Sequence, residues 1–176
     1  IGRRDNAMDN QIKKKGKKRM RYVLMLLIIV LLVVIWSITV EARENELEEW
    51  RDYVENVAEE YGICPELVEA VIERESSWQP DAVNGSCIGL MQINPEYHAD
   101  RLDRLGVENL LDPYDNILVG IDFLAELFWK YEDTYAVLMY YNAGYDGLQD
   151  WRAGKYSDYA VKVAERSAEL EREHGK

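Results

Sequence analysis

The side chains that could do chemistry in this chain are mainly carboxylates. Histidine occurs only twice, at His98 and His174, so a Ser-His-Asp triad or a histidine metal site has little to build on. No glycine-rich segment of the kind that cradles phosphate is present in the sequence. We therefore expect neither a metal nor a cofactor, and look for a working acid among the 33 Asp and Glu residues.

The stretch ERESSWQP, from Glu73 to Pro80, offers two glutamates near the end of an acidic helix. Most glutamates on helices face water, so surface exposure is the default interpretation for both. Three segments argue for more, because they combine apolar and aromatic side chains with Gln, Asn and Ser: ESSWQPDAVNGSCIGLMQINP, DPYDNILVG and YYNAGYDG. Flat apolar faces suit sugar rings and amides suit hydroxyl and N-acetyl groups, which indicates a saccharide-binding cleft.

The elements that must position these segments are helical. Helices are expected, from apolar residues spaced at three and four and from Pro and Gly boundaries, at 44–61, 64–76, 95–104, from 112 onward, at 133–142 and at 157–173. The segment NAGYDG is expected to stop the fifth of these, and 79–89 reads as a loop. Strand-like alternation is nearly absent, so the sequence predicts one compact all-α domain.

At these segments the chain resembles the soluble lytic transglycosylases, which share a lysozyme-like fold with goose-type lysozyme. The segment from Glu75 to Pro95 is similar to their first two motifs, YYNAG at 140–144 to their third, and YAVKV at 159–163 to the tyrosine-containing segment of their last helix. Order and spacing agree over about residues 50–170. The resemblance implies a peptidoglycan-cleaving domain at 50–172.

The resemblance also implies that Glu75 is the catalytic acid and acts alone. It would protonate the oxygen of the MurNAc-β-1,4-GlcNAc bond, then take the proton of the muramic acid 6-hydroxyl, which closes a 1,6-anhydro ring without consuming water. The helix position agrees, since Glu75 lies four after Val71 and three after Ile72, on the apolar side, whereas Glu73 turns away. A carboxyl near an apolar wall such as Met91 and an aromatic hydroxyl would have a raised pKa, which favours the acid form.

Substrate-binding roles are implied for Ser76, Gly89, Met91, Gln92, Tyr141, Asn142 and Tyr159. The hydroxyl of Ser76 and the amide of Gln92 would hydrogen-bond acetamido or lactyl groups. Met91 would form a wall of the cleft, and Gly89 would permit close approach of the backbone.

Aromatic and amide side chains would complete the site. Tyr141 and Asn142 would line the subsite near the acid, and Tyr159 would place its hydroxyl beside Glu75; simple core packing is the alternative for each tyrosine. Trp78 is expected in the core rather than in contact with ligand. The sequence departs from the family pattern at two places: Asn94 stands where methionine is common, and Met139-Tyr140 stand where small alanines are frequent.

Two alternative functions stay open. A hydrolase (muramidase) on the same fold would need a positioned water and usually a second carboxylate, for which Asp81, Asp115 and Asp122 are candidates. A membrane-tethered scaffold of a secretion or conjugation apparatus would bind glycan strands without cutting them. The intact set of motifs favours the enzyme, because a binding protein has no use for a buried acid.

The N-terminus has the composition of a membrane anchor. Residues 1–21 hold nine Lys or Arg and two Asp, a net charge of +7, and the 19 residues from Tyr22 to Val40 carry no charge. A helix of that length spans roughly 28 Å, close to the hydrocarbon core of a bilayer. The basic excess predicts a cytoplasmic tail at 1–21, a transmembrane helix at 22–40, a stalk at 41–49 and an outer domain. The segment VEA, ending at Ala42, resembles a signal peptidase site, so release there is the alternative to a retained anchor.

Charge and cysteines set further expectations for the outer part. From Glu41 onward there are 31 acidic and 12 basic residues, a net of −19, which argues against binding nucleic acid or anionic lipid. The expected partners are glycan strands, the membrane through the N-terminal helix, and a cell-wall or secretion assembly. Cys64 and Cys87 both fall on the outer side, where a disulfide worth about 3 kcal/mol is expected; two buried thiols are the alternative.

Overall fold

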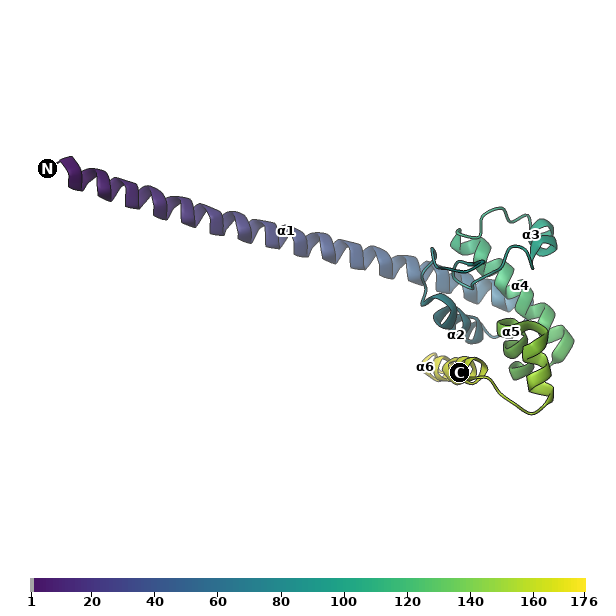
Figure 1. Ribbon diagram of the computed structural model, residues 1–176. Helices are drawn as coiled ribbons and strands as arrows, with labels where there is room; N and C mark the ends of the chain where they lie inside the picture. Colours follow the sequence, from purple (N-terminus) through teal and green to yellow (C-terminus); the bar gives the residue numbers. More distant parts are fainter. Residues whose placement is uncertain (1) are drawn as a thin grey trace. The chain divides into compact units, whose positions relative to one another are not determined.

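The computed structural model describes the main chain of residues 2–176 and the side chains at 18, 20–22 and 24–176. The chain divides into two units, Ile1–Glu46 and Leu47–Lys176. Helix α1 (Gly2–Tyr61) runs through the first unit and contributes its last turns to the second (Figure 1).

The first unit carries the predicted membrane segment. Among the described residues, Met20–Tyr61 includes an 18-residue window of mean hydropathy 3.2, none of which is buried, and this is long and apolar enough to cross a membrane. The expected span at 22–40 falls in this stretch, and the expected stalk at 41–49 is part of the same helix. The side chains of the basic residues at 3–17 and at 19 lie outside the described residues.

The second unit is helical, as predicted. Its elements after α1 are α2 (Pro65–Ser76), β1 (Val83–Asn84), β2 (Cys87–Ile88), α3 (Ala99–Leu105), α4 (Pro113–Tyr131), α5 (Thr134–Arg152) and α6 (Asp158–Glu173). The two strands, each of two residues, form an antiparallel hairpin in which Val83 pairs with Ile88. This hairpin lies inside the segment predicted as loop. The unit begins close to the predicted domain start at residue 50.

Local sequence explains where the helices begin and end. The side chain of Asp112 accepts hydrogen bonds from the first backbone N–H groups of α4, and Pro113 occupies the first turn. The Ser157 hydroxyl caps α6 in the same way. Helix α2 ends abruptly because Ser77 and Trp78 both adopt positive φ, 51° and 59°, and Trp78 is buried as expected.

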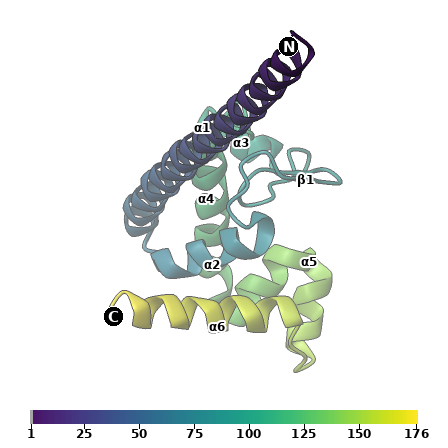
Figure 2. The same ribbon diagram turned by 90° about the vertical axis from the view of Figure 1, so that its left-hand side faces the viewer.

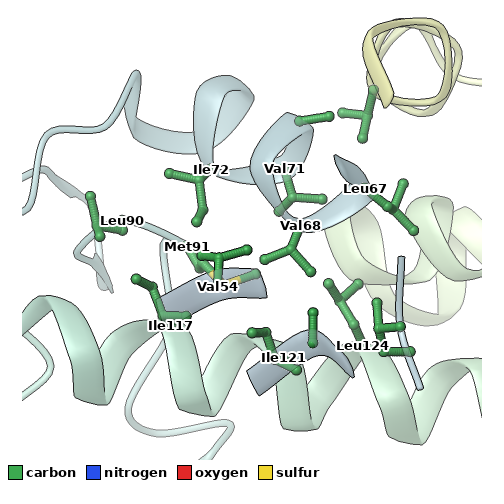
Figure 3. Close-up of a cluster of buried hydrophobic side chains, with 14 of the residues drawn as sticks. Val54, Leu67, Val68, Val71, Ile72, Leu90, Met91, Ile117, Ile121 and Leu124 are labelled. Carbon is green, nitrogen blue, oxygen red and sulfur yellow. The ribbon is translucent and has the colours of Figure 1, made fainter. Parts of the chain in front are cut away.

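The core of the second unit forms where α2, α4 and the end of α1 meet. Figure 3 shows side chains from these helices and from the segment after the hairpin pointing toward one another. Nine of those labelled are completely inaccessible to solvent: Val54, Val68, Val71, Ile72, Leu90, Met91, Ile117, Ile121 and Leu124. Each such side chain stabilises the fold by about 1.5–3 kcal/mol relative to exposure.

Helices α2 and α6 lie side by side and run in opposite directions (Figure 2). Glu66 at the start of α2 is 3.0 Å from the ring of His174, which follows the end of α6. Nearer the other end, the Arg166 guanidinium donates to the carboxylate of Glu73 at 2.7 Å. The antiparallel arrangement therefore brings the last turn of α2 to the first turn of α6.

A buried asparagine on α4 holds the segment that follows the hairpin. The Asn116 side chain is fully buried; its Oδ1 accepts from the backbone N–H of Met91 at 2.7 Å, and its Nδ2 donates to the carbonyls of Ile88 and Leu110, each at 2.9 Å. Gly89 has φ +79°, and a Cβ there would lie 2.2 Å from the Asn116 amide. The expected close approach at Gly89 is confirmed, with Asn116 as the group that requires it.

The helix predicted at 133–142 ends close to where expected, but a second helical stretch follows it directly. Element α5 joins these two stretches across a kink at Gly144, where φ is 58° and ψ is −139°, a non-helical conformation. Glycine reaches this conformation without strain, so NAGYDG ends the first stretch and turns the chain into the second. Gly147 then packs tightly, since a Cβ there would lie 2.0 Å from the carbonyl oxygen of Met139.

The disulfide predicted between Cys64 and Cys87 is wrong, because both are free thiols. Cys64 is the N-cap residue of α2. Burial raises the pKa of the Cys87 thiol, and the nearby charge of Glu75, in the last turn of α2, raises it further. The twelve residues of α2 rise roughly 18 Å, against the roughly 4–7 Å that a disulfide allows between Cα atoms. The cysteines therefore lie toward opposite ends of the helix.

Replacing Asn116 by leucine is expected to destabilise the second unit by roughly 3 kcal/mol or more. Leucine has a similar size but leaves the N–H of Met91 and two carbonyls buried without their partner, at about 1–3 kcal/mol each. Urea unfolding of the full chain in detergent, followed by tryptophan fluorescence, measures the change. Asn56→Leu, at an exposed helix position, is the control and should stay within about 0.5 kcal/mol. Equal stability of the two variants would contradict the role of Asn116.

Candidate active site

Glu75 lies in the last turn of α2 and is paired with a tyrosine from α6. The hydroxyl of Tyr159 donates a hydrogen bond to Oε1 of Glu75 at 2.6 Å. Tyr159 follows the cap of α6 by two residues and is buried, and the antiparallel alignment of α2 and α6 sets it opposite the acid. The prediction that Tyr159 places its hydroxyl beside Glu75 is confirmed.

Burial dominates the electrostatics of this pair. It raises the pKa of the Glu75 carboxyl, and the hydrogen bond from Tyr159 and the charge of Arg74 offset only part of that rise. Burial also raises the pKa of Tyr159 well above its usual range, with the Glu75 charge adding to it, so the phenol keeps its proton and remains a donor. Glu75 is thus more readily protonated than an exposed glutamate, as a general acid requires.

Glu73 is in a different environment, although it lies only two residues away. The Arg166 guanidinium binds both of its oxygens, at 2.7 and 3.1 Å, which keeps Glu73 in a surface ion pair. Glu73 is therefore half-buried in an ion pair between α2 and α6, instead of fully solvated as expected. Residue type does not separate these two glutamates; the helix face on which each lies does.

The second wall near the acid comes from α5 and the segment after the hairpin. Tyr141 donates its hydroxyl hydrogen to the carbonyl of Met91 at 2.7 Å. Burial raises the pKa of Tyr141 well above its usual range, and the charges of Glu75 and Cys87 raise it further. Met91 is completely buried, and a Cβ at Gly120 would lie 2.2 Å from its Sδ, so its side chain belongs to the core. The prediction that the Met91 side chain forms a wall of the cleft is wrong. The main chain of Met91 contributes instead, because it binds Asn116 through its N–H and Tyr141 through its carbonyl.

A cavity of about 650 Å³ adjoins this wall. It is lined by Cys87, Gln92, Ile93, Asn94, Tyr97, His98, Arg101, Phe123, Glu126, Tyr140, Tyr141, Asn142, Ala143 and Gly144. Aromatic rings and side-chain amides dominate the lining, the combination expected of a saccharide site. Of the residues predicted to bind substrate, Gln92, Tyr141 and Asn142 line the cavity.

Two of the predicted polar contacts are engaged within the protein. The Ser76 hydroxyl is buried and donates to the Ile72 carbonyl of its own helix at 3.2 Å. The Gln92 Nε2 donates to the carbonyls of Ala82 and Gly89, at 3.1 and 2.9 Å, and so closes the hairpin loop. The amide nitrogen of Gln92 is thus used to shape the loop, and its carbonyl oxygen is left for a ligand.

A charged group at the far side of the cavity was not anticipated from the sequence. Arg101 of α3 donates to Asp122 of α4 at 2.7 Å, to His98 Nδ1 at 2.8 Å, and to Glu126. Burial first, and then the Arg101 charge, lower the pKa of His98 to about 4, so its ring is neutral and Nδ1 accepts the Arg101 hydrogen. The spacing of four residues between Asp122 and Glu126 shows in the sequence that both lie on one face of α4. Their shared partner, Arg101 of α3, depends on how the two helices pack.

Asn116 was also not singled out from the sequence, although it had a local signal. It stands four residues before Gly120 and eight before Leu124, within the apolar stripe of α4. A lone amide on an apolar face needs hydrogen-bond partners when it is buried. That spacing predicts a structural amide, but not which main chain it binds.

The fold and this site define a lysozyme-like all-α domain in which a desolvated acid, Glu75, lies near the cavity residues Cys87 and Tyr141. Residues 52–162 match the family model described as the transglycosylase SLT domain, which covers more than half of the chain. The chain belongs to the transglycosylase SLT domain family. Among solved structures, the 70-kDa soluble lytic transglycosylase of Escherichia coli matches 71% of this chain and 24% of its own length, with a TM-score of 0.62 and 21% identity.

Two curated relatives show how far the similarity extends. The membrane-bound lytic murein transglycosylase F 1 of Alkalilimnicola ehrlichii is 33% identical over 114 residues, covering 60% of this chain and 22% of that protein. The invasion protein IagB of Salmonella typhimurium is 29% identical over 145 residues, covering 78% of this chain and 84% of that protein. The chain therefore spans less than a quarter of the first relative and most of the second.

Replacing Tyr159 by phenylalanine is expected to raise the pKa of Glu75 further. The lost hydrogen bond stabilises the ionised carboxylate, so burial acts with less opposition once the hydroxyl is gone. Infrared difference spectra of the carboxyl C=O stretch, recorded against pH and assigned with Glu75→Gln, report this titration. Tyr156→Phe, at an exposed position, is the control. An unchanged or lowered pKa of Glu75 in Tyr159→Phe would contradict the pairing.

Proposed function

We propose that this protein is a peptidoglycan lytic transglycosylase, which cleaves the MurNAc-β-1,4-GlcNAc bond and leaves 1,6-anhydro-MurNAc. The observation that carries the proposal is the desolvated Glu75 carboxyl, held by Tyr159 beside a cavity lined with aromatic rings and amides. Membership of the SLT domain family supports it. Peptidoglycan is a polymer of N-acetylated sugars, which this combination of side chains suits.

In the first step, Glu75 acts as a general acid. Its raised pKa provides a proton for the glycosidic oxygen, and the bond to the leaving N-acetylglucosamine breaks as that proton is transferred. The N-acetyl group of the muramic acid would stabilise the positive charge at C1. The carboxylate that forms on Glu75 accepts a hydrogen bond from the Tyr159 hydroxyl, which lowers the free-energy cost of the buried charge.

In the second step, the same carboxylate acts as a base. It takes the proton of the muramic acid 6-hydroxyl while that oxygen attacks C1, which forms the 1,6-anhydro ring and returns Glu75 to its acid form. Protons balance over the two steps and no water is consumed. A single group can perform both roles because burial raises its pKa and favours the acid, while the Tyr159 hydrogen bond stabilises the carboxylate that acts as the base.

The surroundings of Asp122 and Glu126 support the lyase over a hydrolase. Asp122 is held by Arg101 and Arg104, and Glu126 by Arg101 and Lys130; the pKa of each carboxyl is lowered. No second carboxylate is among the described groups that shift the pKa of Glu75. A hydrolytic site would place a base or nucleophile within about 5–9.5 Å of the acid.

The domain is proposed to lie outside the membrane, anchored by the apolar stretch at 22–40. The +7 charge of residues 1–21 favours a cytoplasmic N-terminus. Protease added to intact protoplasts is expected to digest Leu47–Lys176 while the tail stays protected. Digestion only after lysis would mean the opposite orientation, and recovery of the domain in the medium would mean release near Ala42.

Digestion of purified peptidoglycan is expected to yield muropeptides ending in 1,6-anhydro-MurNAc. Each should be one water lighter than the hydrolytic product, because an internal hydroxyl replaces water as the nucleophile. Mass spectrometry of the products, with and without borohydride reduction, measures this. Reducing ends in place of anhydro ends would establish a muramidase.

Glu75→Gln should lower the cleavage rate by at least the roughly 10²–10⁴-fold typical of a general acid, while the fold and glycan binding persist. Glu73→Gln is the matched control and should cleave at nearly the parent rate, because it removes only a surface ion pair. Full activity in Glu75→Gln would reject the acid. Binding without cleavage in both the parent and Glu75→Gln proteins would favour the scaffold.

A further inference from the structure

Aromatic rings lead away from the acid through the cavity in an unbroken series of contacts. The Tyr141 ring, which is within range of the Glu75 charge, lies 5.3 Å from the ring of Phe123 between centroids. Phe123 lies 6.5 Å from Tyr140, and Tyr140 lies 5.6 Å from Tyr131 at the end of α4. Because Phe123, Tyr140 and Tyr141 all line the cavity, this series forms much of its apolar surface.

Tyr140 and Tyr141 are neighbours on α5 but are held differently. The Tyr141 hydroxyl is bound to the Met91 carbonyl, so this tyrosine is tied to the segment beside the acid. Tyr140 is half-buried, and among the described residues its hydroxyl has no hydrogen-bond partner. Its ring is instead held by an edge contact with Phe123 and by a tilted contact of 35° with Tyr131. A ring held in this way can stack on a ligand with little further loss of side-chain freedom.

The polar groups that share the cavity with Tyr140 suit a neutral ligand. The Glu126 carboxylate is paired with Arg101 and Lys130, so this end of the cavity has no unpaired acid. Asn94 uses its Oδ1 to accept from the Glu96 N–H, at 3.0 Å, which leaves its amide hydrogens for an acceptor such as an acetamido carbonyl. A flat ring next to an amide donor matches an N-acetylated sugar better than an ionised peptide stem.

We propose that the Tyr140 ring, supported by Phe123 and Tyr131, binds a sugar ring of the glycan strand beyond the two sugars joined at the cleaved bond. The proposal rests on the function proposed above. Tyr140 and Asn94 are both positions where this sequence departs from the motifs that it resembles. This subsite gives the enzyme a preference for strands long enough to reach Tyr140.

The test measures binding in the Glu75→Gln background, where strands are not cut. Uncrosslinked glycan strands, purified and separated by length, are titrated against the full chain in detergent. Adding Tyr140→Ala is expected to weaken the binding of long strands about 3- to 10-fold and to leave a MurNAc-GlcNAc disaccharide unaffected. Tyr140→Trp should keep the affinity, since it retains a flat ring. Tyr145→Ala, at an exposed residue outside the cavity, is the matched control and should bind all lengths normally.

The outcomes separate this inference from the proposed function. Equal affinity of Tyr140→Ala and its parent for long strands would overturn the subsite, as would an equal loss at every length. Absence of any glycan binding by the Glu75→Gln protein would instead reject the substrate proposed for the whole site. Reducing-end products from the unsubstituted enzyme would reject the lyase reaction and leave the subsite intact.

Discussion

The hydrogen bonds of one buried amide constrain the rest of this site. Asn116 joins α4 to the main chain at Ile88, Met91 and Leu110, and so fixes the segment between the hairpin and α3 against the core. Three main-chain groups would otherwise be buried without partners, a cost of several kcal/mol against a net stability of about 5–15 kcal/mol. Once Met91 is held through its N–H, its carbonyl can orient Tyr141 by accepting a hydrogen bond from the phenol. Tyr141 then lines the cavity close to Glu75.

The acid depends on a second constraint, the antiparallel packing of α2 and α6. That packing buries the end of α2 while supplying one phenol hydroxyl, so Glu75 is desolvated but not stripped of partners. More donors would stabilise the carboxylate and weaken the acid, and fewer would make the ionised intermediate too costly. Glu73, two residues away on the same helix, is instead held in an ion pair with Arg166 of α6.

The sequence was most informative where local chemistry decides the outcome. Asp112-Pro113 and Ser157 predicted helix starts that the structure confirms, because capping involves only neighbouring residues. NAGYDG predicted a helix end, and the non-helical Gly144 interrupts α5 there; the sequence did not predict that a second helical stretch follows directly. Local evidence was misleading at Cys64 and Cys87, since a loop length carries no information on the helix that separates the two thiols.

The sequence by itself determined the helices, the apolar character of the N-terminal helix, and the face of α2 on which Glu75 lies, because periodicity and composition are properties of adjacent residues. Through its motifs it also pointed to Tyr159. Only the tertiary structure decided that Met91 is core, that Asn116 holds its main chain, and that Tyr140 lines the cavity in contact with Phe123 and Tyr131. These facts depend on which helices pack together and at what distance, and residues 25 or more positions apart, such as Met91 and Asn116, meet only through that packing.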